Sequence, residues 1–219
     1  MSSSSCSRRR SNAAITASSG TPLASVAAVA ARNGIAGLEW MATVPGTVGG
    51  AVHGNAGAFG SETKDVLVGA TLMDLNGDTW TVGNADLGFA YRTSILQKTP
   101  IIVVNARFRG TPGDRATTVK RIKEIANERI AKQPLAQPNT GSIFRNPEGD
   151  HAGRLIEAAG LKGATEGGAM VSTKHANFIV NVGDASASDV RSLMERCQLE
   201  VKDKFGVDLI PEVEFVGEW

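Results

Sequence analysis

The amino-acid sequence predicts an α+β protein built from two mixed units, residues 14–110 and 111–219. Strand-like runs and amphipathic helical runs occur together in each half of the chain. The dipeptide Asn76-Gly77 lies between two strand-like runs and is typical of a β-hairpin turn. The Gly- and Pro-containing run at 110–114 is typical of a linker and places the boundary between the units.

The first unit is expected to begin with a helix. Thr21-Pro22-Leu23 favours a helix start with Thr21 as the N-cap, and Gly34 favours its end. The buried face of this helix is expected to contain Leu23, Val26, Val29 and Ala30. Strands are expected at residues 65–75, 78–82 and 101–108.

The second unit is expected to contain three helices, at residues 117–132, 152–159 and 186–205. Ser186 and Asp189 have the spacing of a capping box at the start of the last helix. The buried stripe of this last helix is expected to contain Val190, Leu193, Met194, Cys197 and Val201. The buried stripe of the helix at 117–132 is expected to contain Val119, Ile122, Ile125, Ala126 and Ile130. Strands are expected at residues 169–172, 177–182 and 212–216, and a loop at 133–140.

Composition excludes several classes of function. A net charge of +1 gives no general attraction to nucleic acid or to an acidic membrane surface. No run reaches the roughly 18 apolar residues of a membrane span. Cys6 and Cys197 lie far apart and have no metal-ligand spacing, so we expect no metal site. We expect a cytoplasmic protein, a monomer or a weak oligomer, with neither nucleic acid nor membrane as partner.

The most informative run is 37–60, in which seven residues are glycine. Glycine permits positive φ angles and lets a ligand come close to the backbone, and successive bare N–H groups can hold anions. The run therefore has two interpretations. It is either a loop that cradles a flat cofactor with phosphates or a plain glycine turn between two strands.

Residues 44–51 and then 55–58 resemble the flavin-binding signature of the UDP-N-acetylenolpyruvoylglucosamine reductase family, the flavoenzymes that make UDP-N-acetylmuramate for peptidoglycan. The resemblance implies FAD as cofactor. It assigns FAD contacts to Pro45, Gly46, Thr47, Val48, Gly49, Gly50, Asn55, Gly57 and Ala58. Thr43 stands where the family usually has glycine, and its β-branched side chain is expected to crowd the flavin.

Reduction of an enolpyruvyl ether requires a cation at the carboxylate, a proton donor at the α carbon and a hydride carrier. Tyr91-Arg92-Thr93-Ser94 resembles the family's Tyr-Arg-x-Ser motif, and residues 141–147 resemble its Gly-Ser-x-Phe-Lys/Arg-Asn-Pro motif. The closing run at 211–217 resembles Pro-Glu-Val-x-x-x-Gly. The resemblance implies that the catalytic residues are Arg92, Ser142 as the proton donor, and Glu212.

From the residues alone, each of these motifs also has an interpretation without a catalytic role. Arg92 would be a surface arginine, and residues 141–147 would be a polar turn before proline. Glu214 would be as good a candidate as Glu212, because the two lie on the same face of a strand. The resemblance further implies that the substrate is UDP-N-acetylglucosamine enolpyruvate and that NADPH is the reductant. It places at the substrate Tyr91, Lys132, Asn146 and His175, the last without a proton-transfer role.

The resemblance begins near Ile15 and covers nearly all of the chain after it. It implies that 14–110 is the second half of a vanillyl-alcohol-oxidase-like FAD-binding region and that 111–219 is the substrate-binding domain. Residues 1–13 are expected to be a disordered or artificial leader, and the family's Gly-x-Gly-Ser-Asn subdomain is not matched. We therefore expect a reductase with impaired activity. The alternatives are a non-redox UDP-sugar-binding module and a different flavin-dependent oxidase of the same superfamily.

Overall fold

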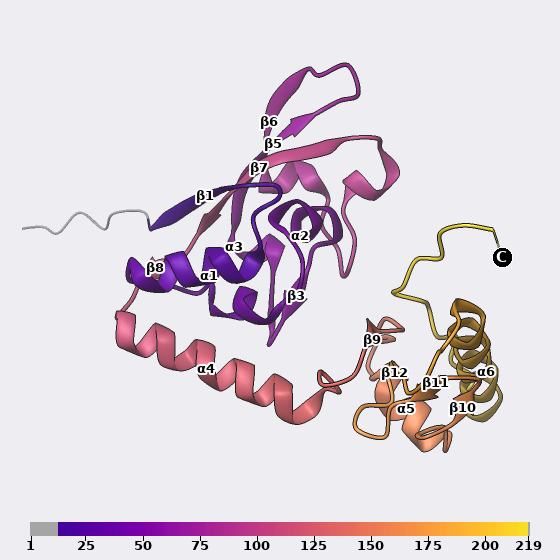
Figure 1. Ribbon diagram of the computed structural model, residues 1–219. Coiled ribbons are helices and arrows are strands. Elements are labelled where there is room, and N and C mark those ends of the chain that lie inside the picture. Colours follow the sequence, from indigo (N-terminus) through magenta and orange to yellow (C-terminus); the bar gives the residue numbers. More distant parts are fainter. Residues whose placement is uncertain (1–12, 219) are drawn as a thin grey trace, which may run out of the picture. The chain divides into compact units, whose positions relative to one another are not determined.

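The computed structural model describes residues 13–218, so the predicted leader lies outside the described residues apart from Ala13. The chain forms two compact units that divide between Asn127 and Glu128. Figure 1 shows that each unit combines helices with a small sheet, which confirms the predicted α+β class. Each unit is described by itself below.

Unit 1 is built on a four-stranded antiparallel sheet in the order β1-β7-β5-β6. The strands are β1 (Ala14–Ser18), β5 (Leu67–Met73), β6 (Thr79–Gly83) and β7 (Ile102–Arg109). The β5–β6 hairpin turns at Gly77, whose φ of +92° suits glycine. The carboxylate of Asp74 accepts hydrogen bonds from the N–H groups of Asn76 and Asp78. The predicted strands and hairpin are therefore confirmed.

Helices α1 (Leu23–Arg32) and α2 (Val48–Gly54) supply much of the apolar core that packs on this sheet. α1 differs from its prediction in two details. Its N-cap is Pro22, which makes no side-chain cap hydrogen bond, so Thr21 is not the N-cap. Val29 is 38% exposed. It lies about 240° around the helix from Leu23, whereas the buried stripe continues through Ala27 and Ala31.

The remaining elements of unit 1 are short. They are β2 (Ile35–Ala36), η1 (Glu39–Thr43), β3 (Gly57–Ala58), β4 (Ser61–Glu62), α3 (Thr63–Val66), η2 (Asn84–Leu87), η3 (Ile95–Lys98) and β8 (Thr111–Pro112). β8 pairs with β2, and the Gly113 N–H donates to the Gly34 carbonyl at 2.8 Å. Residues 110–114 are thus paired within unit 1 and are not a linker, and the observed division lies further along the chain than the predicted boundary.

Helix α4 (Arg115–Lys132) follows directly and contains the division between the units. The Asp114 carboxylate accepts the Thr117 N–H at its start, at 2.8 Å. Ile125 is buried as predicted, whereas Ile130 is 58% exposed. Ile130 lies past Asn127, beyond the residues that pack on the core of unit 1.

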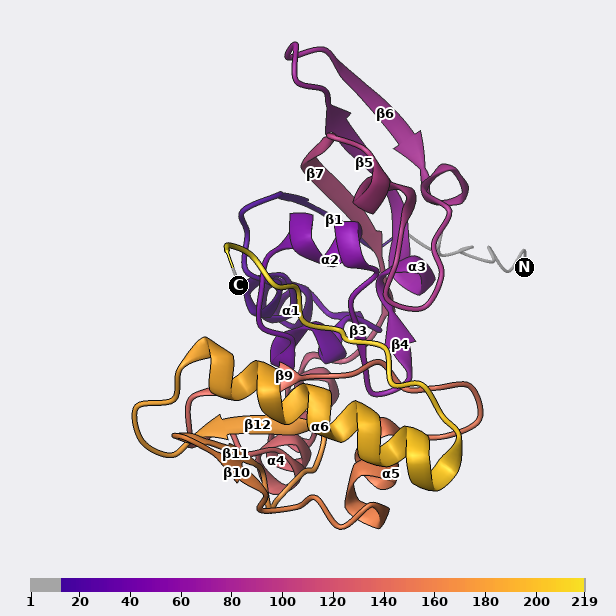
Figure 2. The same ribbon diagram turned by 90° about the vertical axis from the view of Figure 1, so that its right-hand side faces the viewer.

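Unit 2 has a four-stranded antiparallel sheet in the order β10-β11-β12-β9. The strands are β9 (Asn139–Ser142), β10 (Thr165–Glu166), β11 (Ala169–Val171) and β12 (Phe178–Asn181). Helix α5 (Ala152–Ala158) and the long helix α6 (Ala187–Phe205) complete the unit, and Figure 2 shows α6 lying across the sheet. The Ser186–Asp189 capping box is present as predicted. Burial raises the pKa of the Cys197 thiol to about 12, which fits a core residue.

The predicted last strand, residues 212–216, is wrong. Pro211 makes one isolated bridge with Phe144, and the Glu212 N–H donates to the Ile143 carbonyl at 2.9 Å. In the described part of the chain no strand is assigned after Pro211. Alternation of side chains cannot make a strand without a neighbouring edge to pair with.

Candidate functional site

The glycine-rich loop is anchored on the connection between β1 and α1. The Leu23 N–H donates to the Gly46 carbonyl, and the Gly49 N–H donates to the Ser19 carbonyl at 2.9 Å. A Cβ at Gly49 would lie 2.0 Å from the Ser19 Oγ, so glycine allows this close approach. The loop is therefore held in one place by backbone contacts on both sides.

Within the loop, residues 45–47 and Gly50 are exposed, whereas Val48 and Gly49 are buried. Gly46 has a φ of +125°, and a Cβ built there meets nothing within 4 Å. This open, glycine-lined surface fits a flat ring system lying against the backbone. The exposed residues can thus contact a flavin directly, and the buried ones support the loop.

Most of the loop N–H groups that were expected to be free for an anion donate hydrogen bonds inside the protein. The Val48 N–H donates to the Thr21 carbonyl, and the Gly50 N–H donates to the Thr47 Oγ1 at 3.5 Å. Among the described residues, the N–H groups of Gly46 and Thr47 remain as the donors of this loop without a hydrogen bond inside the protein. The anion-holding capacity predicted for the run is therefore smaller than its glycine content suggested.

Thr43 is the last residue of η1, and its Oγ1 donates to the Trp40 carbonyl at 3.2 Å. Thr43 is not among the described residues with a positive φ, so threonine adds no backbone strain here. The crowding of a flavin by Thr43 stays a prediction.

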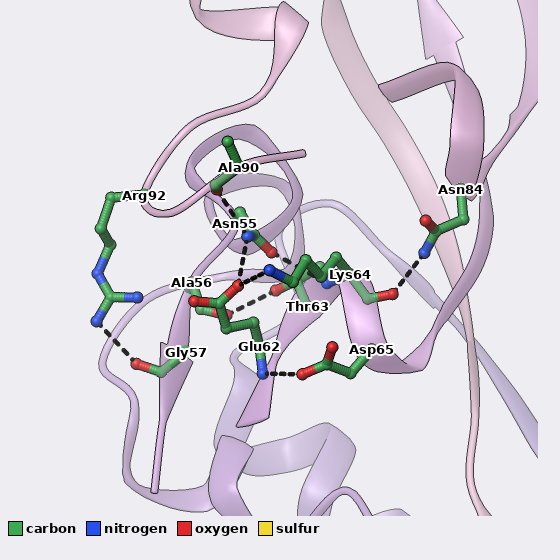
Figure 3. A network of polar contacts seen from close by, with 10 residues as sticks. All are labelled: Asn55, Ala56, Gly57, Glu62, Thr63, Lys64, Asp65, Asn84, Ala90 and Arg92. Atoms are coloured by element: carbon green, nitrogen blue, oxygen red, sulfur yellow. Dashed lines mark hydrogen bonds and ion pairs between the residues drawn. The ribbon is translucent and has the colours of Figure 1, made fainter. Parts of the chain in front are cut away.

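Tyr91 and Arg92 form the tip of a tight turn in unit 1. Ala90 and Thr93 exchange two backbone hydrogen bonds, each of 3.1 Å, across the turn. Arg92 has a φ of +56° and donates from Nη2 to the Gly57 carbonyl at 3.1 Å, as Figure 3 shows. Its guanidinium carbon lies 5.0 Å from the centre of the Tyr91 ring. The turn presents a cation beside an exposed aromatic ring.

The predicted cofactor residues of the next segment differ in exposure. Gly57 and Ala58 form β3 and are half-buried. Asn55 has no exposed surface, and its side-chain amide bonds to three residues on two other segments of unit 1. Its side chain therefore acts within the protein, not at an open surface.

In unit 2, two of the predicted catalytic residues lie on neighbouring segments. Ser142 ends β9, pairs with Phe178, and is followed by Ile143, whose carbonyl accepts the Glu212 N–H. Ser142 and Glu212 are both half-buried. Glu214 is exposed, so the structure distinguishes the two glutamates that periodicity alone left equivalent. Arg92, the third predicted catalytic residue, belongs to unit 1.

Asn177 holds the segment after Ser142, and sequence reasoning missed it. It is 4% exposed. Its Oδ1 accepts the Phe144 N–H at 3.0 Å, and its Nδ2 donates to the Phe144 carbonyl at 2.8 Å. The side chain thus takes the place of a paired strand. The one available signal was an asparagine inside an apolar run, where this residue is usually depleted.

The predicted substrate residues of unit 2 and α4 have partners of their own. The Asn146 Oδ1 accepts the Ala152 N–H at the start of α5, at 3.1 Å. Exposed Lys132 pairs with Glu128 at 2.7 Å. The His175 Nδ1 accepts the Asn177 N–H at 3.2 Å, so a neutral ring carries its proton on Nε2. Burial, with a smaller effect of Lys162, lowers the pKa of His175.

Two features are absent from residues 13–218. No group of three or more His, Cys, Asp or Glu side chains in this range is arranged to hold a metal ion. None of the helices in this range combines the length and apolar character needed to cross a membrane.

Comparisons with known proteins cover both units. Residues 133–216 match the C-terminal domain of UDP-N-acetylenolpyruvoylglucosamine reductase, and residues 7–83 match a FAD binding domain. The UDP-N-acetylenolpyruvoylglucosamine reductase of Agathobacter rectalis is 47% identical over 94% of this chain and 65% of its own length. The enzyme of that name from Caldicellulosiruptor saccharolyticus is 46% identical over 94% of this chain and 67% of its own length.

The crystal structure of UDP-N-acetylenolpyruvylglucosamine reductase from Thermus caldophilus superimposes with a TM-score of 0.78 at 35% identity. It covers 89% of this chain, which in turn covers 70% of that structure. The chain thus spans about two thirds of the length of the curated relatives it matches. With this identity over both units, the chain belongs to the UDP-N-acetylenolpyruvoylglucosamine reductase family.

Proposed function

We propose that this chain carries the substrate-binding and catalytic residues of an NADPH-dependent, FAD-mediated reductase. Its reaction is the conversion of UDP-N-acetylglucosamine enolpyruvate to UDP-N-acetylmuramate in peptidoglycan synthesis. The observation that supports the proposal is the backbone hydrogen bond from the Glu212 N–H to the carbonyl of Ile143, the residue after Ser142, because it joins two motifs far apart in the sequence. Family membership supports the same reaction.

Each side chain has a separate role in this proposal. When bound, FAD supplies hydride to the β carbon of the enolpyruvyl group. Ser142 donates a proton to the α carbon; the hydroxyl is a weak acid, but an enolate carbon is basic enough to accept it. Arg92 neutralises the charge that develops on the carboxylate through its planar guanidinium. Glu212 is the acidic partner at the carboxylate end of the substrate.

Four further residues are proposed to bind the substrate. Asn146 keeps its amide N–H groups for the diphosphate, because its Oδ1 is already used by Ala152. Lys132 adds a positive charge, and His175 offers a neutral Nε2–H. Tyr91 offers an exposed ring beside Arg92.

Ser142→Ala tests the proton-donor role. When the variant is supplied with FAD, NADPH is expected to reduce its flavin at the wild-type rate. The rate at which the enolpyruvyl substrate reoxidises the flavin is expected to fall by about 10²-fold or more, the usual contribution of a positioned acid. Stopped-flow absorbance of the flavin measures both half-reactions. Equal loss in both would remove Ser142 from the proton step.

Two ligand experiments separate the alternatives. A rise in melting temperature with a UDP-sugar and none with FAD would favour a non-redox binding module. Turnover with oxygen, without any response to UDP-N-acetylglucosamine enolpyruvate, would favour a different flavin oxidase.

We further infer that the protein works in the cytoplasm, where nucleotide sugars and NADPH are supplied, as a monomer or a weak oligomer. Sedimentation at several protein concentrations tests the oligomeric state.

A further inference from the structure

We propose that Asn55 is a positioning residue for Arg92: its buried amide fixes the turn that carries the guanidinium. The inference rests on the proposed function for the role of Arg92, but the geometry that it concerns lies entirely within unit 1. It gives Asn55 a task different from the cofactor contact implied by the family signature.

Asn55 makes three hydrogen bonds with its side chain, and both of its amide N–H groups are used. Its Nδ2 donates to the Glu62 Oε2 and to the Ala90 carbonyl, each at 2.9 Å, and its Oδ1 accepts the Lys64 N–H at 3.0 Å. Figure 3 shows these bonds converging on one side chain. Asn55 is 0% exposed, so water cannot replace a lost bond without entering the core.

The backbone of Asn55 also suits this place. It caps the C-terminus of α2 in the left-handed conformation, with a φ of +46°. Asparagine and glycine tolerate this conformation better than other residues do. The side chain is therefore directed by the end of the same helix that begins in the glycine-rich loop.

The Arg92 turn needs support from outside because its own conformation is unfavourable. A φ of +56° is uncommon for a residue with a long side chain. The Ala90 carbonyl that Asn55 holds also accepts the Thr93 N–H that closes the turn. On the other side of the turn, Ser94 Oγ donates to the His53 carbonyl at 2.7 Å. The end of α2 thus holds both flanks of the turn.

The guanidinium is held by the same region. Arg92 Nη2 donates to the Gly57 carbonyl, two residues after Asn55. Glu62, which accepts from Asn55, is itself paired with the Lys64 Nζ at 2.9 Å. Loss of the Asn55 amide would therefore release the turn and leave the half-buried carboxylate of Glu62 with one donor fewer.

Hydrogen exchange of the unliganded chain tests the inference first. Asn55→Gly keeps the left-handed backbone and removes all three bonds. It is expected to raise the exchange rates of the Ala90 and Thr93 N–H groups by about tenfold relative to those of the β7 ladder. Asn84→Ala is the control: Asn84 donates to the Lys64 and Leu67 carbonyls in the same region but does not touch the turn. It is expected to leave that ratio unchanged.

The wild-type chain gives a measurement that needs no variant. If Asn55 and the turn open together, the two Nδ2 protons of Asn55 and the Thr93 N–H show the same opening free energy once each exchange rate is divided by the intrinsic rate of its own group. Different opening free energies would overturn the inference, as would a ratio to β7 that stays unchanged in Asn55→Gly. Equal acceleration throughout unit 1 would also overturn it, because Asn55 would then support the whole unit and not this turn.

Kinetics of the FAD-loaded enzyme then connects the turn to the reaction. Asn55→Gly is expected to raise the KM for the enolpyruvyl substrate several-fold and to leave the KM for NADPH unchanged. In an Arg92→Ala background the same substitution is expected to have no further effect. Independent, multiplying effects would overturn the inference. A wild-type enzyme without turnover would instead count against the proposed function, while the exchange result would still stand.

Discussion

Two buried asparagines, Asn55 and Asn177, each use both ends of a side-chain amide, and each bonds to a segment far away in the sequence: Asn55 to the Ala90 carbonyl, and Asn177 to both backbone groups of Phe144. Asn55 is 0% and Asn177 4% exposed. One holds the turn of Arg92 and the other the segment after Ser142. At the residue scale, the side chains proposed to act in the reaction are therefore supported by amides that have no reactivity of their own.

Asn177→Ala is expected to destabilise unit 2 by about 2–6 kcal/mol. It leaves a backbone N–H and a carbonyl of Phe144 buried without a partner, and each such group costs about 1–3 kcal/mol. Urea denaturation of unit 2 measures the change. Asn181→Ala is the control, because Asn181 is exposed and water can replace its bonds to Gly183 and Ala185. Comparable losses in both variants would contradict this account.

His175 is expected to make stability depend on pH. Its pKa is lowered in the folded chain, mainly by burial and also by Lys162, while Glu157 opposes the shift. The unfolded chain, with an ordinary histidine pKa of about 6.5, then binds more protons than the folded chain does. The free energy of unfolding therefore falls as the pH falls below that value and through the lower folded pKa.

His175→Asn keeps an acceptor for the Asn177 N–H and removes the titration. Between neutral pH and about pH 5, the wild type is expected to lose more unfolding free energy than the variant does. Denaturant unfolding over this range measures it. If the difference in unfolding free energy stayed constant with pH, the pKa of His175 would not be lowered in the folded chain.

At the scale of elements, the N-termini of α6 and α1 differ in whether a side chain caps them. In α6 the Ser186 Oγ accepts the Asp189 N–H at 3.1 Å, and the Asp189 carboxylate accepts the Ser186 N–H at 2.9 Å. In α1, Thr21 has the same type of side chain just before the helix, but no side-chain bond caps it. Similar sequence signals thus give different local energetics.

Ser186→Ala is accordingly expected to cost about 1 kcal/mol, the typical value of an N-cap. Thr21→Ala is expected to cost less than half of that, because the backbone carbonyl of Thr21, which accepts the Val48 N–H, is unchanged. Denaturation of the two variants provides the comparison. A larger loss in Thr21→Ala would mean that its hydroxyl caps α1 in solution.

At the scale of the whole molecule, the chain has two apolar cores, one in each unit. One core joins side chains of α1, α2 and the first sheet, such as Leu23, Val52 and Phe108. The other joins α5, α6 and the second sheet, such as Ile156, Val171 and Met194. A unit with its own core can in principle fold alone.

Residues 128–219 are therefore expected to fold as an isolated fragment. Its urea transition is expected to be cooperative and to fall near the corresponding transition of unit 2 in the full chain. Chemical-shift dispersion of the fragment in NMR checks the same point independently. A fragment without either property would show that unit 2 depends on unit 1 for its stability.

The sequence by itself determined the elements that depend on neighbouring residues. The hairpin at Asn76-Gly77, the capping box of Ser186 and Asp189, and the stop of α1 at Gly34 follow from backbone preferences within a few positions. The motif residues Ser142 and Glu212 were also predicted, although only the resemblance selected them.

Only the tertiary structure decided which segments pair. It joined β8 to β2 where a linker was expected, and gave residues 212–216 no strand to pair with. It also gave Asn55 and Asn177 partners 35 and 33 positions away. A buried amide or a strand edge is stabilised by whatever group meets it in space, and local preferences carry no information about a partner so distant along the chain.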